Sequence, residues 1–218
     1  MTPGDIRHKP HLLIGFLSLF YSVGILLFWI QETKPFFIFL TPFSLILSFA
    51  AVLVFQKEWT LKWIIACIFV FTGALVIEII GVNKGTLFGR YYYGNALGIK
   101  ILDTPILIGL NWLILVYCTS AIVNHFAKKK ITRIFLGALL MVAYDVLLEY
   151  VAPAMDMWSW ETRYPGIRNF VMWFLTALVF HVLFQLLDLK IENKPARYLF
   201  LIQILFFCGI VLSTLWAV

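Results

Sequence analysis

The chain has 218 residues, of which 62% are hydrophobic and 13% charged, and its mean hydropathy is +0.95. Soluble globular domains are roughly half apolar and a quarter charged, so this composition excludes a soluble protein and indicates an integral membrane protein in a lipid bilayer. The formal net charge of +6 does not indicate nucleic-acid binding, because the basic residues are scattered between apolar segments. The three cysteines all lie in apolar runs, which predicts neither a disulfide framework nor a metal site.

Seven apolar stretches are long enough to cross a membrane, because a hydrocarbon core of about 30 Å needs about 20 apolar residues in a helix. The sequence therefore predicts an all-α, polytopic integral membrane helix bundle that forms a single transmembrane domain over residues 1–218. The first stretch is too long for a signal-peptide core and is expected to be retained. Helices are expected near residues 12–31, 36–55, 61–83, 104–125, 131–151, 168–187 and 197–216.

The basic residues are distributed unevenly between the two sides of this predicted bundle. Of the 17 Lys and Arg residues, eleven lie in the N-terminal segment and the even-numbered loops, and six lie in the odd-numbered loops. Cytoplasmic loops are enriched in Lys and Arg, so we expect the N-terminus in the cytoplasm and the C-terminus outside. The loops after the third and fifth helices then lie together on the non-cytoplasmic side.

Three acidic residues lie within predicted spans, where an ionisable side chain is costly and indicates a functional site. Glu78 lies near the outer end of the third helix, and Asp145 and Glu149 lie four residues apart on one face of the fifth. Two carboxylates this close in a low-dielectric site cannot both ionise cheaply, so at least one is expected to remain protonated and act as a proton donor. The alternative is a structural role, in which the acids cap helix ends or pair with Arg90, Arg163 or Arg168.

Each acidic segment is followed by a loop rich in aromatic residues, and we expect the two stretches to face each other. The first reads EIIGVNKGTLFGRYYY from Glu78, and the second runs from Tyr144 to Trp173. Their rings could line a path for a long apolar ligand and stabilise a developing cation, although any single ring also fits an interfacial aromatic belt. The candidate substrate-binding rings are those of Phe88, Tyr91, Tyr93, Trp112, Trp158, Trp160 and Trp173.

Two amides and the histidines complete the set of candidate polar residues. Asn111 and Asn169, near the outer ends of the fourth and sixth helices, are candidates for holding a water or a carboxyl group, or for a hydrogen bond between helices. The histidines do not form a ligand set, and the sequence has neither a dinucleotide-binding nor a phosphate-binding glycine motif. We therefore expect no metal and no cofactor.

The acid-containing stretches resemble a known family. The stretch from Glu78 is similar to the pattern E-x-x-G-V-x-x-G-x-x-F-G-x-Y-x-Y of the carotenoid biosynthesis membrane proteins, which are typified by the carotenoid 1,2-hydratase of bacteria and haloarchaea. Asp145, Glu149 and the following W-x-W and N-F-x-x-W segments resemble that family's second pattern, and the similarity covers about residues 70–180. The chain departs from the pattern at Thr104 and Tyr150, and Gly166 follows its proline instead of preceding it.

The resemblance implies a cofactor-independent carotenoid hydratase, a carbon–oxygen lyase of a bacterial or archaeal inner membrane. It would add water to the terminal 1,2 double bond of an acyclic carotenoid end, as in lycopene or γ-carotene, by protonation to a tertiary carbocation and capture by water. We assign Asp145, one turn deeper, as proton donor, Glu149 as water-orienting base and Glu78 as supporting acid. The alternatives are a lycopene cyclase-type enzyme and a non-catalytic polyene-binding or transport protein, and the oligomeric state stays open.

Overall fold

The computed structural model describes residues 9–216 and contains the seven long helices that the sequence predicts. Each is long and apolar enough to span a membrane, so the chain is an integral membrane protein. The helices are α2 (Pro10–Trp29), α3 (Lys34–Leu53), α4 (Leu61–Lys84), α5 (Leu107–Phe126), α6 (Lys130–Val151), α7 (Ile167–Leu186) and α8 (Lys194–Trp216).

Short strands lie in the loops between these helices. Strand β1 (Tyr91–Tyr93) pairs antiparallel with β4 (Trp158–Trp160), and β2 (Lys100–Ile101) pairs antiparallel with β3 (Thr104–Pro105). The fourth predicted helix was expected to begin near residue 104, but α5 begins at Leu107. The reason is that Thr104 and Pro105 form β3 and pair with β2 in extended backbone. Pro105 also disfavours helical backbone at Thr104.

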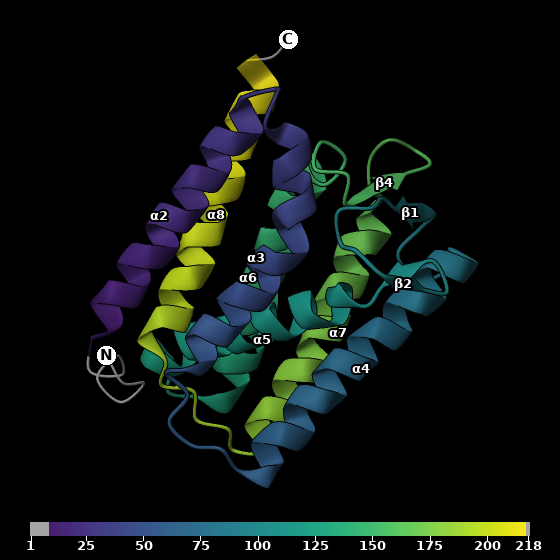
Figure 1. Ribbon diagram of the computed structural model, residues 1–218. Coiled ribbons are helices and arrows are strands. Elements are labelled where there is room, and N and C mark those ends of the chain that lie inside the picture. Colours follow the sequence, from purple (N-terminus) through teal and green to yellow (C-terminus); the bar gives the residue numbers. More distant parts are fainter. Residues whose placement is uncertain (1–8, 217–218) are drawn as a thin grey trace.

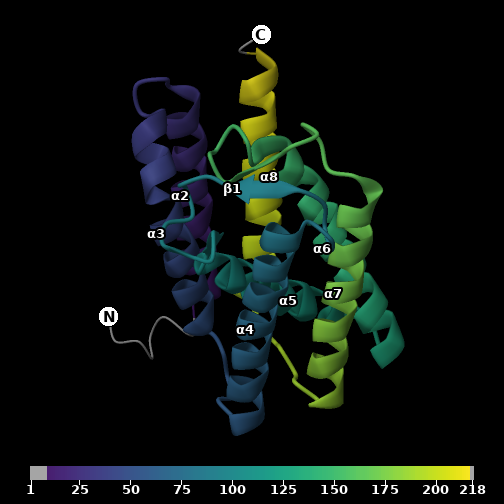
Figure 2. The same ribbon diagram turned by 90° about the vertical axis from the view of Figure 1, so that its right-hand side faces the viewer.

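Helix α5 is the centre of the bundle. It packs against α3, α4, α6, α7 and α8, and a larger share of it is buried than of any of the other six long helices. Helices α2, α3 and α8 group on one side of it, and α4 and α7 lie together on the other (Figures 1 and 2). The outer helices expose large apolar side chains such as Leu19, Phe39 and Ile68, as expected for surfaces that face lipid rather than water.

A buried polar network holds the start of α8 to α5 and to the end of α3. The Asn193 side chain donates to the Val52 carbonyl at 2.7 Å and to the Tyr117 hydroxyl at 2.8 Å, and its oxygen accepts from the Ala196 N–H at 3.0 Å. Tyr117 in turn donates to Gln56 at 2.6 Å. Because the Asn193 side chain is bonded through both its nitrogen and its oxygen, it both begins α8 and joins three segments.

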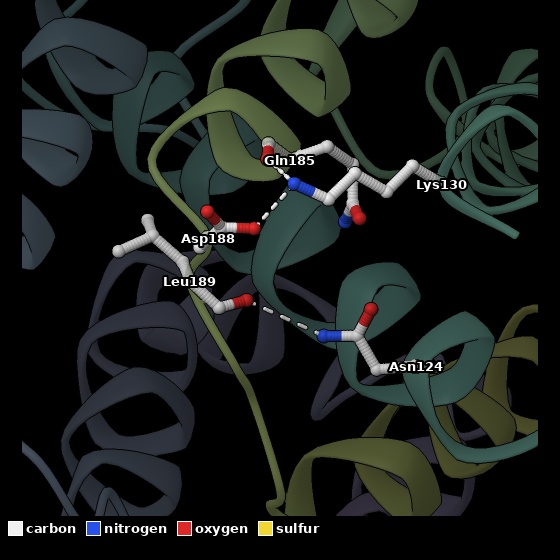
Figure 3. A network of polar contacts seen from close by, with 5 residues as sticks. All are labelled: Asn124, Lys130, Gln185, Asp188 and Leu189. Atoms are coloured by element: carbon white, nitrogen blue, oxygen red, sulfur yellow. Dashed lines mark hydrogen bonds and ion pairs between the residues drawn. The ribbon is translucent and has the colours of Figure 1, made fainter. Parts of the chain in front are cut away.

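A second set of polar contacts joins the start of α6 to the end of α7 (Figure 3). Lys130 forms an ion pair with Asp188 and donates to the Gln185 carbonyl at 3.2 Å, while Asn124 donates to the Leu189 carbonyl at 3.5 Å. The hydrogen bond and positive charge of Lys130 hold the pKa of the Asp188 carboxyl below its usual value. These contacts lie at the end of the bundle opposite to strands β1 and β4.

Replacing Asn193 by alanine should lower the free energy of unfolding by about 1–3 kcal/mol, because the Tyr117 hydroxyl and the Val52 carbonyl lose a donor in a buried setting. The midpoint of thermal unfolding in detergent micelles measures the effect. The neighbouring change Glu192→Ala is the control, since its ion pair with Lys57 is exposed and should contribute little. Equal shifts for the two variants would contradict the assignment.

Candidate active site

The end of α4 and the loop behind it fold back over Glu78. Gly85 ends the helix with a left-handed backbone (φ +62°) and donates to the Gly81 carbonyl at 2.8 Å. A Cβ at Gly81 would lie 2.6 Å from the Phe88 ring and 3.1 Å from the Tyr91 hydroxyl. Glycine at both positions therefore lets β1 return against the last turns of α4, directly above the buried carboxylate.

Glu78 is 3% exposed and accepts three hydrogen bonds. The Tyr91 and Tyr93 hydroxyls donate to Oε2 at 2.5 and 2.8 Å, and the Trp112 indole nitrogen donates to Oε1 at 2.9 Å. Burial, and then the charge of Glu78, raise the pKa of both tyrosines well above their usual value. The phenols therefore stay protonated and act as donors to a carboxylate whose two oxygens are both engaged.

Asp145 and Glu149 share one amide. Asn169 Nδ2 donates to Asp145 Oδ2 at 2.9 Å and to Glu149 Oε1 at 3.2 Å, and the indole nitrogens of Trp160 and Trp158 donate to Glu149 Oε2 at 2.5 and 3.2 Å. Asp145 is fully buried, whereas Glu149 is half-buried. Asp145 Oδ1 has no hydrogen-bond partner among residues 9–216. Amide and indole N–H groups can only donate, so Glu149 is surrounded as an anion would be, while Asp145 keeps one oxygen that can carry a proton.

The pairing of β1 with β4 confirms that the two aromatic stretches face each other. Tyr91 is opposite Trp160 and Tyr93 is opposite Trp158, with ring centroids 5.1 and 6.1 Å apart. These four rings are buried on one face of the ribbon, and the intervening Tyr92 is 60% exposed on the other. Side chains alternate between the faces of a strand, which explains why the buried rings occur at every second position.

These groups enclose a cavity of about 20 Å³, which is enough for about one water molecule. The Trp112 ring behind it stacks on that of Trp173 at 4.1 Å between centroids. The sequence does not distinguish Ile108 as a lining residue, because it is one apolar residue among many in an apolar helix. The cavity is lined by Glu78, Glu149, Asn169, Ile108, Phe88, Tyr91, Tyr93, Trp158, Trp160 and Trp173.

Three of the residues singled out in the sequence do not line this cavity, and one of them is Trp112, whose indole donates to Glu78. Asp145 is joined to the cavity wall through Asn169, which donates to both Asp145 and Glu149. Asn111 is separate from the acids and lines a second cavity of about 230 Å³ between α2, α3, α5, α6 and α8.

The arginine alternative is wrong for all three acids. Arg90 approaches the exposed Glu161 at 3.9 Å, and Arg168 donates to the Gly85 carbonyl at 3.1 Å. Arg163 lies over the Tyr164 ring at 5.5 Å. The buried carboxylates are thus held by neutral donors from tyrosine, tryptophan and asparagine, and among residues 9–216 none of the three forms an ion pair with a lysine or arginine.

Comparison with known proteins identifies the family. A family model described as "Carotenoid biosynthesis protein" matches residues 40–217, so the chain belongs to this family of membrane proteins and has a role in carotenoid biosynthesis. Its substrate is therefore a carotenoid, and its surroundings are the lipid bilayer. Searches among curated proteins and solved structures found no match.

Removing the charge of Glu78 should make Tyr91 and Tyr93 easier to ionise. In Glu78→Gln their pKa should fall, so tyrosinate absorbance should appear at lower pH than in the unchanged protein, because a neutral amide no longer repels a phenolate. A spectrophotometric pH titration in detergent measures this. Glu161→Gln, a change at an exposed acid of the next loop, should leave the curve unchanged. An unaltered curve for Glu78→Gln would show that the carboxylate does not control these phenols.

Proposed function

We propose that the protein is a carotenoid hydratase that adds water to the terminal 1,2 double bond of an acyclic end, as in lycopene or γ-carotene. The observation that supports this most is the small cavity itself. It has room for about one water molecule, two carboxylates in its wall, a third joined through Asn169, and six aromatic rings around them. Addition of water to an alkene needs an acid, a positioned water and walls that tolerate a cation, and the carboxylates, the room for one water and the aromatic walls support this reaction.

In this proposal the Asp145–Glu149 pair holds one proton. Asp145 gives it to the less substituted carbon of the double bond, which leaves a tertiary carbocation at the terminal carbon. The oxygen of the cavity water forms a bond to that cation, and a water proton passes to Glu149. The pair has then exchanged one proton for another, and return of the proton from Glu149 to Asp145 resets it. The free Oδ1 of Asp145 and the three N–H donors on Glu149 support this order of roles.

Glu78 and the rings would stabilise the cation between these steps. Glu78 accepts hydrogen bonds from three donors, which favours a fixed negative charge, and a fixed charge needs no reorganisation when the cation forms. The faces of Trp158, Trp160 and Tyr93 add electron-rich surface at the same cavity. Glu78 is thus a supporting acid and not the donor.

Asp145→Asn should abolish hydration, because asparagine keeps the shape and the hydrogen bond with Asn169 but has no proton to transfer. Loss of general-acid catalysis should reduce product by at least about 100-fold, measured by pigment mass analysis in a lycopene-producing host. Glu149→Gln should have a comparable effect. Glu161→Gln, at the exposed acid near the site, is the matched control and should retain full activity. Immunoblotting of the membrane fraction checks that each variant accumulates.

The product identifies the reaction. A product heavier by one water supports the proposal, a cyclic product of unchanged mass would indicate a cyclase, and unchanged pigment would indicate a binding or transport protein. If Asp145→Asn retained hydration and Glu78→Gln lost it, the roles of the two acids would be exchanged.

We further propose that the N-terminus is cytoplasmic and that the site faces the other side of the membrane. The start of α2 and the end of α8 lie at opposite ends of the bundle, and β1 and β4 lie toward the end at which α8 ends (Figure 1). Reporter fusions test the orientation. A fusion at the C-terminus should be active only outside the cytoplasm, and one between Lys128 and Lys130 only inside. The reverse pattern would invert the orientation.

A further inference from the structure

A second cavity of about 230 Å³ lies beside the acid-lined one. Its walls are apolar side chains from α2, α3, α5, α6 and α8, together with Met155 and Met157 from the loop after α6. It reaches the lipid-facing surface, because Val23 lines it and is 43% exposed. It is smaller than the pockets of about 300–1,000 Å³ that enclose drug-sized ligands, so it admits one end of a long chain while the remainder lies in the bilayer.

The same three segments contribute residues to both cavities. In each segment one residue lines the acid-lined cavity and a residue one to three positions away lines the second. These pairs are Ile108 and Asn111 in α5, Glu149 and Leu148 in α6, and Trp158 and Met157 at β4. Of these two cavities the acid-lined one is too small for a hydrocarbon end and has room for about one water, so a hydrocarbon end fits only the second.

Three polar residues of the second cavity, Tyr21, Tyr144 and Gln203, bond to one another, and Thr41 and Ser44 bond to backbone carbonyls of their own helix. The Tyr21 hydroxyl contacts Ser48 at 2.9 Å and accepts from Gln203 Nε2 at 2.9 Å, and Tyr144 donates to Gln203 Oε1 at 3.3 Å. Asn111 is different. It is 4% exposed, it lines the cavity, and its Nδ2 has no hydrogen-bond partner within the part of the chain that the structure describes. An unpaired buried donor is unfavourable, and a ligand oxygen would satisfy it.

We propose that this cavity binds one end of a linear isoprenoid chain, and that Asn111 sets its specificity by hydrogen-bonding an oxygen on that chain. A hydroxyl fits best, because it can accept from the amide nitrogen and donate to the amide oxygen. The inference rests on the proposed function, which forms a hydroxyl at a chain end beside the wall that contains Asn111. In that setting Asn111 holds the hydroxylated end, and the hydrocarbon body occupies the apolar part of the cavity.

Equilibrium binding of two radiolabelled probes to the full chain in lipid nanodiscs tests the inference. The alcohol phytol and the hydrocarbon phytane share one branched skeleton, and neither has the terminal double bond of the proposed substrate. The unchanged protein should bind phytol more tightly. Asn111→Leu should lower that preference by about two- to tenfold, the range of one uncharged hydrogen bond, without weakening phytane.

A pair of cavity variants makes the test independent of the amide. Leu40→Trp places a large ring in the cavity wall and should weaken both probes. Leu47→Trp, on the same helix but 38% exposed and outside the cavity, should weaken neither. Equal affinity for phytol and phytane in the unchanged protein, or unaltered binding in Leu40→Trp, would overturn the inference.

Measurements of probe binding and of carotenoid hydration distinguish a failure of this inference from a failure of the proposed function. If the probes bind as expected but no carotenoid is hydrated, the hydratase proposal fails and the binding site stands. If hydration occurs and continues unchanged in Leu40→Trp, the hydratase proposal stands and this cavity is not the site of the chain end.

Discussion

Burial of carboxylates without a cation is the constraint on which this structure depends. A charged group removed from water is costly unless it is hydrogen-bonded, and Glu78, Asp145 and Glu149 all lie in apolar helices that are long enough to span a membrane. Hydrogen bonds from neutral donors offset this cost for Glu78 and Glu149, which each accept three of them. A negative charge held by neutral donors beside a small, aromatic cavity is the kind of environment that favours a developing cation.

The donors come from segments that are distant in the chain, and the fold is arranged to bring them together. Strand β1 carries the phenols to Glu78, strand β4 carries the indoles to Glu149, and the pairing of these two strands fixes one set against the other. Helix α5 supplies Trp112 from the centre of the bundle, and α7 supplies Asn169 between the paired acids. The glycines at the end of α4 permit the close return of β1 that this convergence requires.

Separate cavities suit a reaction between water and a hydrocarbon. The acid-lined cavity is small and has two carboxylates in its wall, the second cavity is larger and mostly apolar, and both are lined by residues of α5, of α6 and of the segment at the start of β4. A path for the chain from the bilayer and a separate place for water would limit how many water molecules reach the cation. Only the water that the acids hold would then be near the reacting carbon, which is the arrangement that controlled addition of water needs.

The sequence by itself determined the membrane class, the seven helices and most of the residues around the acids. Apolar length decides what spans a bilayer, and a costly carboxylate in such a span marks a site wherever it occurs. Only the tertiary structure decided which donor serves which acid, that Asn169 bridges two of them, and that Asn111 belongs to another cavity. The physical reason is that these relations depend on the packing of α5 against five other helices and on the register of β1 with β4. Contacts between residues so far apart in the chain leave no pattern in a single sequence.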